Sequence, residues 1–246
     1  MAAPDPAARL LEGFPADLPH VTVHVWRVAP HRVPHAVLRQ ALDRALLRAA
    51  RPDGLRFAKL LGTSTGRTFG PTDADPTTWA LLACWRDRAA ADAAEDAPTY
   101  AAWRALATET LRLDLRPLSS RGRWARREPF GDPVPVRHDG PVAAVTRARL
   151  RPAAAARFWR ASGPVADDLH RSPGLRLTLG IGEAPLGLQG TLSVWDSAAD
   201  LVAFATRGAV HADVVRRTPL ERWYAEELFA RFAILDATGT HRGRAA

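Results

Sequence analysis

The chain has few of the residues that covalent and metal cross-links need. Its 246 residues include one cysteine, Cys84, and among its 34 basic residues the only lysine is Lys59. A lone thiol excludes an internal disulfide and a cysteine-based zinc cage, so the chain has no need of an oxidising compartment. No apolar run approaches about 18 residues, and the first residues lack the basic start and apolar core of a secretory signal. These absences predict a cytoplasmic protein.

The composition is that of an ordinary globular chain. Hydrophobic residues make up 47% and charged residues 24%, which excludes a disordered or low-complexity protein. The net charge of +8 comes almost entirely from arginine in an alanine-rich chain. Because this arginine is spread along the sequence, the basic balance alone does not predict a nucleic-acid partner.

The sequence contains an internal repeat. Residues 20–28 and 140–150 alternate apolar and polar positions, as strands do, and each is followed by an alanine-rich helical segment. A Gly-Leu-Arg phrase then opens a second strand in both copies, at 54–62 and 174–180. A third strand ends in Trp85 and in Trp195, each followed by an Asp and another alanine-rich helix. The pattern predicts two tandem split β-α-β units.

The helix of the first copy carries one apolar stripe, which we expect to face the core: Val37, Leu38, Ala41, Leu42, Ala45 and Leu46. In the second copy Gly163-Pro164 predicts a broken or kinked helix. Closing strands are expected near 113–118 and 228–235.

These elements predict an α+β fold in which two tandem ferredoxin-like repeats form a dimeric α+β barrel within one chain. The strand at 79–85 is apolar at nearly every position, which favours burial on both faces. The two bare sheet faces therefore meet, and the barrel interior is the expected pocket. The predicted organisation is a flexible segment at 1–19, repeat 1 at 20–116, an Arg/Pro-rich linker at 117–139 and repeat 2 at 140–243.

Several phrases, in this order and spacing, resemble the spheroidene monooxygenase family, the acyclic carotenoid 2-ketolases. They are found between residues 20 and 243: KLLGT at 59–63, WALLACW at 79–85, VTRA at 145–148, GIGEAP at 180–185, HADVV at 211–215 and WYAEELFARF at 223–232. The resemblance implies the same barrel fold and a haem-dependent monooxygenase that oxygenates an apolar substrate, with a carotenoid as the example. It also implies an electron donor and transient contact with the inner membrane surface, where such a substrate resides.

Three residues are candidates for the chemistry. His211 is the expected haem ligand, because imidazole commonly binds haem iron; the alternative is a solvated helix residue. Arg147 either projects into the barrel, to hold a propionate or polarise bound oxygen, or is solvated on an edge strand. Lys59 either reaches a propionate or extends its ammonium group to solvent at the barrel mouth.

Other motifs predict less. The loop at 180–185 lacks the glycines and the Lys-Ser/Thr of a phosphate-binding loop, so it is a turn in which Glu183 is either a surface residue or a pocket carboxylate. No carboxylate pair lies near His20, His24, His31 and His35, and we expect these to be solvated histidines and not a metal site.

Arginines flank Trp124 in the linker, a pattern that meets phosphates in some proteins, but nucleic-acid binding is not expected here. The segment could equally dock on the barrel or touch an acidic lipid surface. Two alternatives to the monooxygenase remain: another haem-dependent reaction on the same barrel, of the dehydratase type, or a non-catalytic protein that binds haem or an apolar ligand.

Overall fold

The computed structural model describes residues 14–15, 17–67, 71–134, 136–183, 188–207 and 223–245. The first half contains β1 (His20–Val28), α2 (Val33–Ala49), β2 (Leu55–Ser64), β3 (Ala74–Trp85), α3 (Arg88–Ala93), α4 (Pro98–Leu106) and β4 (Ala107–Gly122). The second half repeats this order with β5 (Val142–Leu150), α5 (Ala155–Arg171), β6 (Leu175–Gly182), β7 (Leu188–Trp195), α6 (Ala198–Arg207) and β8 (Tyr224–Gly239). Short 3-10 turns lie at Pro30–Arg32, Pro71–Asp73, Ala94–Asp96 and Pro152–Ala154.

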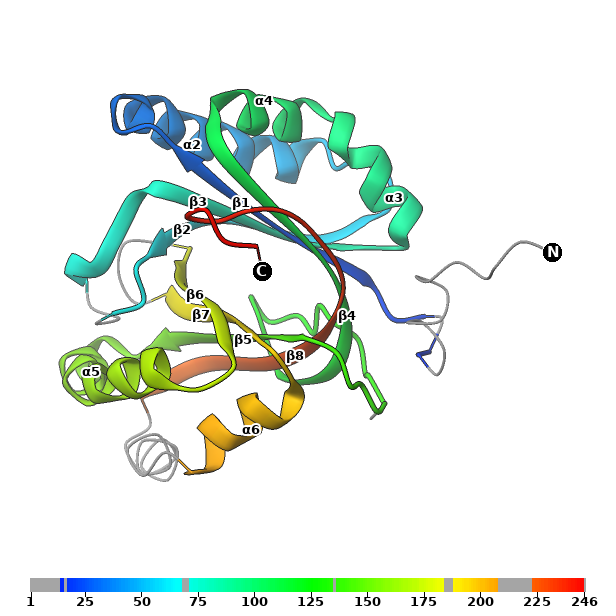
Figure 1. Cartoon of the computed structure of the whole chain (residues 1–246). Coiled ribbons are helices and arrows are strands. Elements are labelled where there is room, and N and C mark those ends of the chain that lie inside the picture. Colours follow the sequence, from blue (N-terminus) through cyan, green and yellow to red (C-terminus); the bar gives the residue numbers. More distant parts are fainter. Residues whose placement is uncertain are drawn as a thin grey trace.

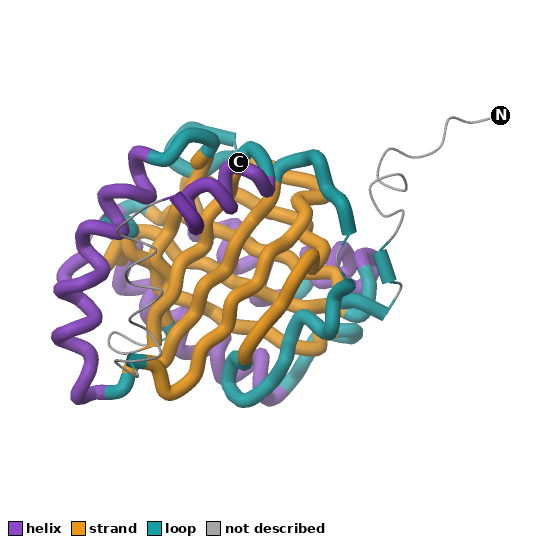
Figure 2. Tube along the Cα trace, turned by 90° about the horizontal axis from the view of Figure 1, so that it is seen from below, coloured by secondary structure: helices purple, strands orange, loops and turns teal. Residues whose placement is uncertain are grey.

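The eight strands close into one antiparallel barrel in the order β1-β3-β2-β6-β7-β5-β8-β4. Helices α2, α3 and α4 cover one outer side, and α5 and α6 cover the other (Figure 1). Viewed from below, the strands of the two halves cross between these helical layers (Figure 2). The predicted α+β barrel of two ferredoxin-like repeats is confirmed.

Strand register shows how closely the two halves correspond. Trp85 ends β3 opposite His20 of β1, and Trp195 ends β7 opposite Val142 of β5. Each tryptophan is also the partner of the first residue of the neighbouring strand, Leu55 in one half and Leu175 in the other. Register therefore assigns each position of β1 an equivalent in β5, and the same holds for β3 and β7.

The face that α2 buries is not the predicted one. Its apolar stripe faces solvent, with Leu38 70% exposed and Leu42 48% exposed, whereas the buried residues are Ala36 and Asp43. The Asp43 carboxylate accepts hydrogen bonds from Trp103 Nε1 (3.0 Å) and Thr99 Oγ1 (3.3 Å) of α4 and from Arg39. The prediction failed because these polar partners, distant in sequence, make the carboxylate side of the helix the inner side.

The helix of the second half does not break. Helix α5 runs without interruption from Ala155 to Arg171 with Pro164 inside it. The missing proline N–H removes one internal hydrogen bond, and the remaining turns maintain the helix on both sides.

The barrel interior, predicted to be a pocket, is packed core in the described residues. Apolar side chains from all eight strands meet there, and two further rings enter from the connecting segment, Trp124 and Phe130, both fully buried. Phe130 packs edge-on against Phe232 with ring centres 4.8 Å apart. The segment between the repeats therefore contributes core residues to the barrel.

The boundary predicted between repeat 1 and the linker falls inside a strand. β4 continues to Gly122, where a positive φ of 91° begins a tight turn, and β8 ends in the same way at Gly239, with φ of 86°. A Cβ at either glycine would lie 2.2 Å from a carbonyl oxygen of the neighbouring strand, so glycine is required at both ends.

Within the described residues, no helix has the length and apolar character that crossing a bilayer demands.

Candidate functional site

Four charged side chains converge at one end of the barrel interior. Arg147 of β5 is 2% exposed and donates to Glu183 through Nη2 (2.9 Å) and to Glu226 through Nη1. Lys59 Nζ of β2 donates to the other Glu183 oxygen at 2.5 Å. We name Lys59, Arg147, Glu183 and Glu226 the barrel ion cluster.

Aromatic rings enclose this cluster. Trp124 Nε1 donates to Glu183 Oε1 at 2.7 Å, and the Arg147 guanidinium lies 5.8 Å from the Trp124 ring centre. Lys59 lies 5.6 Å from the ring centre of Phe57, which in turn packs edge-on against Trp124. Both cations therefore gain ring contacts in addition to their carboxylate partners.

The charges of the cluster are balanced. Burial alone would raise the pKa of Glu183, but the hydrogen bond and charge of Lys59, with further help from Trp124 and Arg147, keep this pKa below its usual value. Burial likewise opposes ionisation of Glu226, and its pKa is lowered by the backbone N–H groups of Arg126 and Ala125 and by Arg147. The site therefore holds two carboxylates and two cations in a largely dry environment, where one lost charge leaves another uncompensated.

Strand register shows that the fold does not require this cluster. Arg147 is paired with Gly190 and Leu228, and the position with the equivalent partners in the first half is Val25, paired with Ala80 and Leu111. By the same comparison Lys59 of β2 corresponds to Leu179 of β6. The opposite end of the barrel thus closes with apolar side chains at the positions where this end has two cations.

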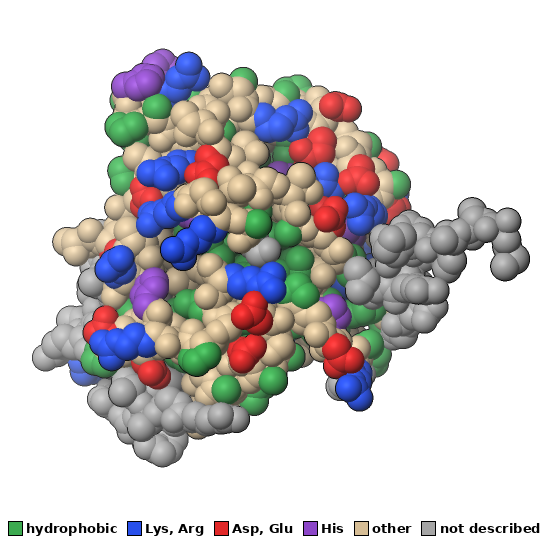
Figure 3. Space-filling view, viewed as in Figure 1, with side chains coloured by type: hydrophobic (Ala, Val, Ile, Leu, Met, Phe, Trp, Pro, Cys, Tyr) green, Lys and Arg blue, Asp and Glu red, His purple; other side chains and the backbone are tan. Residues whose placement is uncertain are grey.

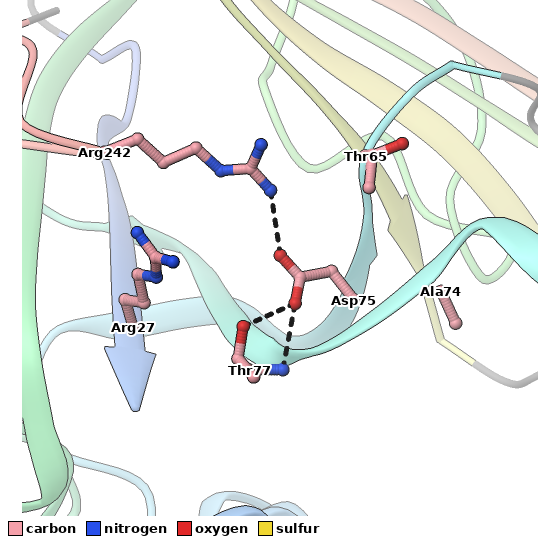
Figure 4. A pocket seen from close by; sticks show the side chains of 6 residues that line it. All are labelled: Arg27, Thr65, Ala74, Asp75, Thr77 and Arg242. Atoms are coloured by element: carbon pink, nitrogen blue, oxygen red, sulfur yellow. Dashed lines mark hydrogen bonds and ion pairs between the residues drawn. The ribbon is translucent and has the colours of Figure 1, made fainter. Parts of the chain in front are cut away.

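A small polar pocket lies near that opposite end (Figure 4). It is lined by Arg27, Thr65, Ala74, Asp75, Thr77 and Arg242. Asp75 accepts hydrogen bonds from Arg242 Nη2 (3.0 Å) and from the backbone N–H of Thr77 (3.0 Å), so its carboxylate is already engaged. Such a lining does not suit an apolar substrate.

The helix-facing sides of the two sheets differ in the size of their side chains. In the first half Trp26 and Trp79 lie opposite each other in register, and the rings of both lie near Trp103. The equivalent positions of the second half are Ala148 and Gln189. His24 and Leu81 are likewise replaced by Thr146 and Thr191. On this side of the sheet the second half therefore has the smaller residues Ala148, Thr146 and Thr191 where the first half has Trp26, His24 and Leu81.

One polar atom on this face is left without a partner. Thr178 of β6 lies beside Ser193, and its hydroxyl is buried with no hydrogen-bond partner among the described residues. Ser193 itself accepts from Trp195 Nε1 at 2.9 Å. A buried hydroxyl of this kind is available to a bound group.

The histidines of β1 are buried and paired, contrary to the expectation that they are solvated. His20 Nε2 lies 2.6 Å from Asp114 Oδ1, and His24 Nε2 lies 2.6 Å from Glu95 Oε1. Arg112 joins the two pairs by binding both carboxylates. These carboxylates lie 94 and 71 residues away in sequence, so no local pattern could have indicated them. The described residues contain no cluster of three or more potential metal ligands.

The predicted site residues have different outcomes. Arg147 and Lys59 are brought together by Glu183, which is a buried carboxylate and not a surface turn residue. His211 lies outside the described residues. Glu226 was missed, because a glutamate in an alternating strand resembles a solvated one. Trp124 follows the alternative in which the linker docks on the barrel, because its ring is fully buried and cannot stack on a nucleotide base.

Two curated sequences are similar to the chain over most of its length. A spheroidene monooxygenase of Rubrivivax gelatinosus is 42% identical over 196 residues, covering 78% of this chain and 73% of the relative. That of Rhodobacter capsulatus is 37% identical over 196 residues, covering 77% of this chain and 80% of the relative. The chain belongs to the spheroidene monooxygenase family. As a member of this family it is a monooxygenase, and the predicted resemblance is confirmed.

The comparison of this spheroidene monooxygenase family member with solved structures shows similarity of fold alone. An aldoxime dehydratase superposes with a TM-score of 0.57 at 10% identity, covering 88% of this chain and 81% of that one. A second, aldoxime dehydratase OxdRE with butyraldoxime, gives 0.54 at 13% identity, covering 90% and 81%. No protein-family model matches the chain.

Proposed function

We propose that the chain is a haem-dependent monooxygenase that introduces oxygen into an acyclic carotenoid. The observation that carries the proposal is the similarity, at 37% and 42% identity, to two spheroidene monooxygenases over more than three quarters of the chain. The substrate class follows from the names of those relatives. Transfer of one oxygen atom from O₂ into a C–H bond, with reduction of the other to water, takes two electrons and two protons and gives an alcohol. A keto group needs a second such transfer at the same carbon followed by loss of water, so an electron donor is also part of the proposal.

The described residues fit a planar apolar cofactor on the helix-facing side of the second half. Ala148 and Thr191 stand where the first half has Trp26 and Leu81, so we propose that the cofactor lies on this side of the sheet, towards α5 and α6. The buried Thr178 hydroxyl provides a hydrogen bond for a polar group there. The equivalent region of the first half is filled by tryptophan rings and offers no such space.

His211 is the residue we propose to ligate the iron through its imidazole. When bound, haem iron would supply the activation of O₂ that oxygen insertion at an allylic C–H bond of a carotenoid needs. The small side chains of β5 and β7 would leave room for the cofactor and an apolar chain while excluding water.

Arg147 of β5 and Lys59 of β2 point into the barrel interior and not towards the helices, because successive side chains of a strand alternate between its faces. Their cationic ends are already bound to Glu183 and Glu226, so a propionate would have to replace one of these carboxylates. We propose them as groups that influence the site through the barrel ion cluster, and the spectrum of an Arg147→Leu variant compared with that of the parent chain tests this role.

The cofactor is tested by expressing the full chain with a haem supply and recording its absorption spectrum. We expect a Soret band that His211→Ala abolishes or shifts strongly, and that Ala148→Trp abolishes by filling the proposed space. His35→Ala, at an exposed histidine of α2, is the matched control and leaves the band unchanged. An unchanged band in both site variants, with folding confirmed by circular dichroism, rejects this position for haem.

The reaction is tested by co-expressing the chain with enzymes that supply an acyclic carotenoid and analysing the pigments for keto products. Confirmed haem binding and a working electron donor without any oxygenated carotenoid would reject the substrate class and leave the cofactor assignment intact.

A further inference from the structure

Helix α2 presents an apolar face that nothing in the described structure covers. Val37 is 50%, Leu38 70%, Leu42 48% and Leu46 39% exposed. Ala41, Ala45 and Ala49 are exposed beside them and extend the same face along the helix. Side chains at these spacings form one continuous stripe, which is uncommon on the free surface of a soluble protein.

The charges around this stripe are of one sign. Between Pro30 and Arg51 the only acidic residue is Asp43, which is fully buried and bound to Arg39. The exposed basic and imidazole side chains lie at the two ends and along the edges of the stripe: His31, Arg32, His35, Arg48 and Arg51. Figure 3 shows hydrophobic side chains next to basic and histidine side chains at the end of the molecule where Figure 1 places α2.

We propose that the exposed face of α2 docks onto the surface of an anionic lipid bilayer. An apolar stripe flanked by long cationic side chains is the pattern of helices that lie in the plane of the interface, since arginine stems cover the acyl boundary while their guanidinium groups reach phosphates. Each basic residue near an anionic surface strengthens the attraction, and salt weakens it.

A second copy of the chain suits this face less well. In a twofold pair the two helices would run antiparallel or parallel, so Arg48 and Arg51 of one copy would approach either His31 and Arg32 or the same two arginines of the other. The stretch from Pro30 to Arg51 has no exposed carboxylate to compensate these charges. An anionic bilayer supplies the missing negative charge over the whole length of the helix.

The buried side of α2 makes this docking compatible with a stable fold. The helix is held to α4 through Asp43 and to the end of β6 through Arg44, which donates to the Glu183 carbonyl. Neither contact uses a residue of the stripe. The inference goes beyond the proposed function, because binding to lipid can be measured without haem, substrate or electron donor.

The test is co-sedimentation of the full chain with phosphatidylcholine vesicles prepared with and without phosphatidylglycerol. We expect binding to the anionic vesicles that weakens in high salt, and a fall of about tenfold or more in the partition coefficient of the Leu38→Glu/Leu42→Glu variant. Val37→Glu and Val134→Glu form the matched pair, since these valines are 50% and 52% exposed and only the first is on α2. Val37→Glu is expected to reduce binding, and Val134→Glu to leave it unchanged.

Three results would overturn the proposal: no binding to anionic vesicles, equal loss in both valine variants, or a parent chain that sediments as a dimer and becomes monomeric in Leu38→Glu/Leu42→Glu without any vesicle binding. The last result would assign the face to a second copy. The unfolding temperature of each variant is measured as a check on folding. We expect it to stay close to that of the parent chain, because the substituted side chains are exposed.

Discussion

Glu183 is the residue on which both cations of the barrel ion cluster depend. Its two oxygens accept from Lys59 (2.5 Å), Arg147 (2.9 Å) and Trp124 (2.7 Å), while only 10% of its side chain is exposed. Replacing the carboxylate by an amide would leave Lys59 without its carboxylate partner in the described structure and Arg147 with Glu226 alone. The charges of the cluster compensate one another. Removing one of the four charged groups is therefore expected to lower the free energy of unfolding by more than the whole cluster contributes to it, because it leaves a buried charge uncompensated.

We therefore expect Glu183→Gln to lower the free energy of unfolding by about 3 kcal/mol, measured as a shift of the urea midpoint at unchanged slope. Glu128→Gln is the control, because Glu128 forms an exposed pair with Arg123 and its loss has little effect. Adding Lys59→Met to Glu183→Gln should cost less than the sum of the single changes. Equal effects of the two glutamine substitutions would contradict the role of Glu183.

Asp114 makes the stability of the chain sensitive to acid. Burial opposes its ionisation, but hydrogen bonds from His20 and Arg112 lower its pKa from 3.8 to about 2. Because the folded pKa is below the unfolded one, the stabilisation is fully present above pH 4 and is lost as the pH falls towards 2.

We expect Asp114→Asn to be less stable than the parent chain at neutral pH and to lose less stability between pH 4 and pH 2. Urea unfolding at a series of pH values measures this difference. Parallel curves for the two proteins over that interval would show that Asp114 is not the group responsible.

At the scale of the element, α2 shows how a helix can place its apolar side outward. Its inner face is anchored by a buried carboxylate whose partners, Thr99 and Trp103, belong to α4. A leucine usually contributes more to stability than an aspartate on the same helix, because the leucine is usually the buried one. In α2 the opposite holds for the adjacent residues Leu42 and Asp43. The leucine contributes to a surface, and the aspartate holds two helices together.

This reversal predicts that Asp43→Ala lowers the free energy of unfolding by roughly 3 kcal/mol or more, because Arg39 and the Trp103 N–H lose their acceptor in a buried setting. Leu42→Ala should change it by less than about 0.5 kcal/mol, as is usual for an exposed position. Chemical denaturation of the two variants side by side measures both. A larger loss for Leu42→Ala would mean that the stripe of α2 is buried in solution.

In the whole molecule, two strand pairings of unequal length join the two halves, and we call these pairings the seams of the barrel. β4 and β8 pair along almost their full length, from Leu111 with Gly239 to Gly122 with Leu228. β2 and β6 pair only through residues 62–64 and 180–182. The barrel is closed at one side by a long ladder and at the other by a short one that contains three glycines.

Hydrogen exchange should distinguish these seams. We expect the backbone N–H groups of residues 62–64 and 180–182 to exchange faster than those of residues 111–116 and 230–236, because a short ladder opens without unfolding the whole barrel. Exchange mass spectrometry of the intact chain measures this order. Equal protection of both seams would show that the barrel opens only by global unfolding.

Much of the fold could be predicted from the sequence because its signals are local. Two-residue alternation, glycine turns and the repeated Trp-Asp ends of β3 and β7 are properties of short segments, and their recurrence indicated two equivalent halves. The same locality explains the failures: neither the inner face of α2 nor the burial of Trp124 can be read from neighbouring residues.

The order of elements, the pairing of two repeats into a barrel and the family to which the chain belongs all follow from the sequence. Which side chains share a site depends on the tertiary structure. Lys59, Arg147, Glu183 and Glu226 are far apart along the chain and meet because β2, β5 and β8, together with the residue that follows β6, place their side chains in one interior. The structure also decided that Asp43 faces inward and Leu38 outward, because a buried carboxylate must lie where its donors are, and those donors are contributed by another helix.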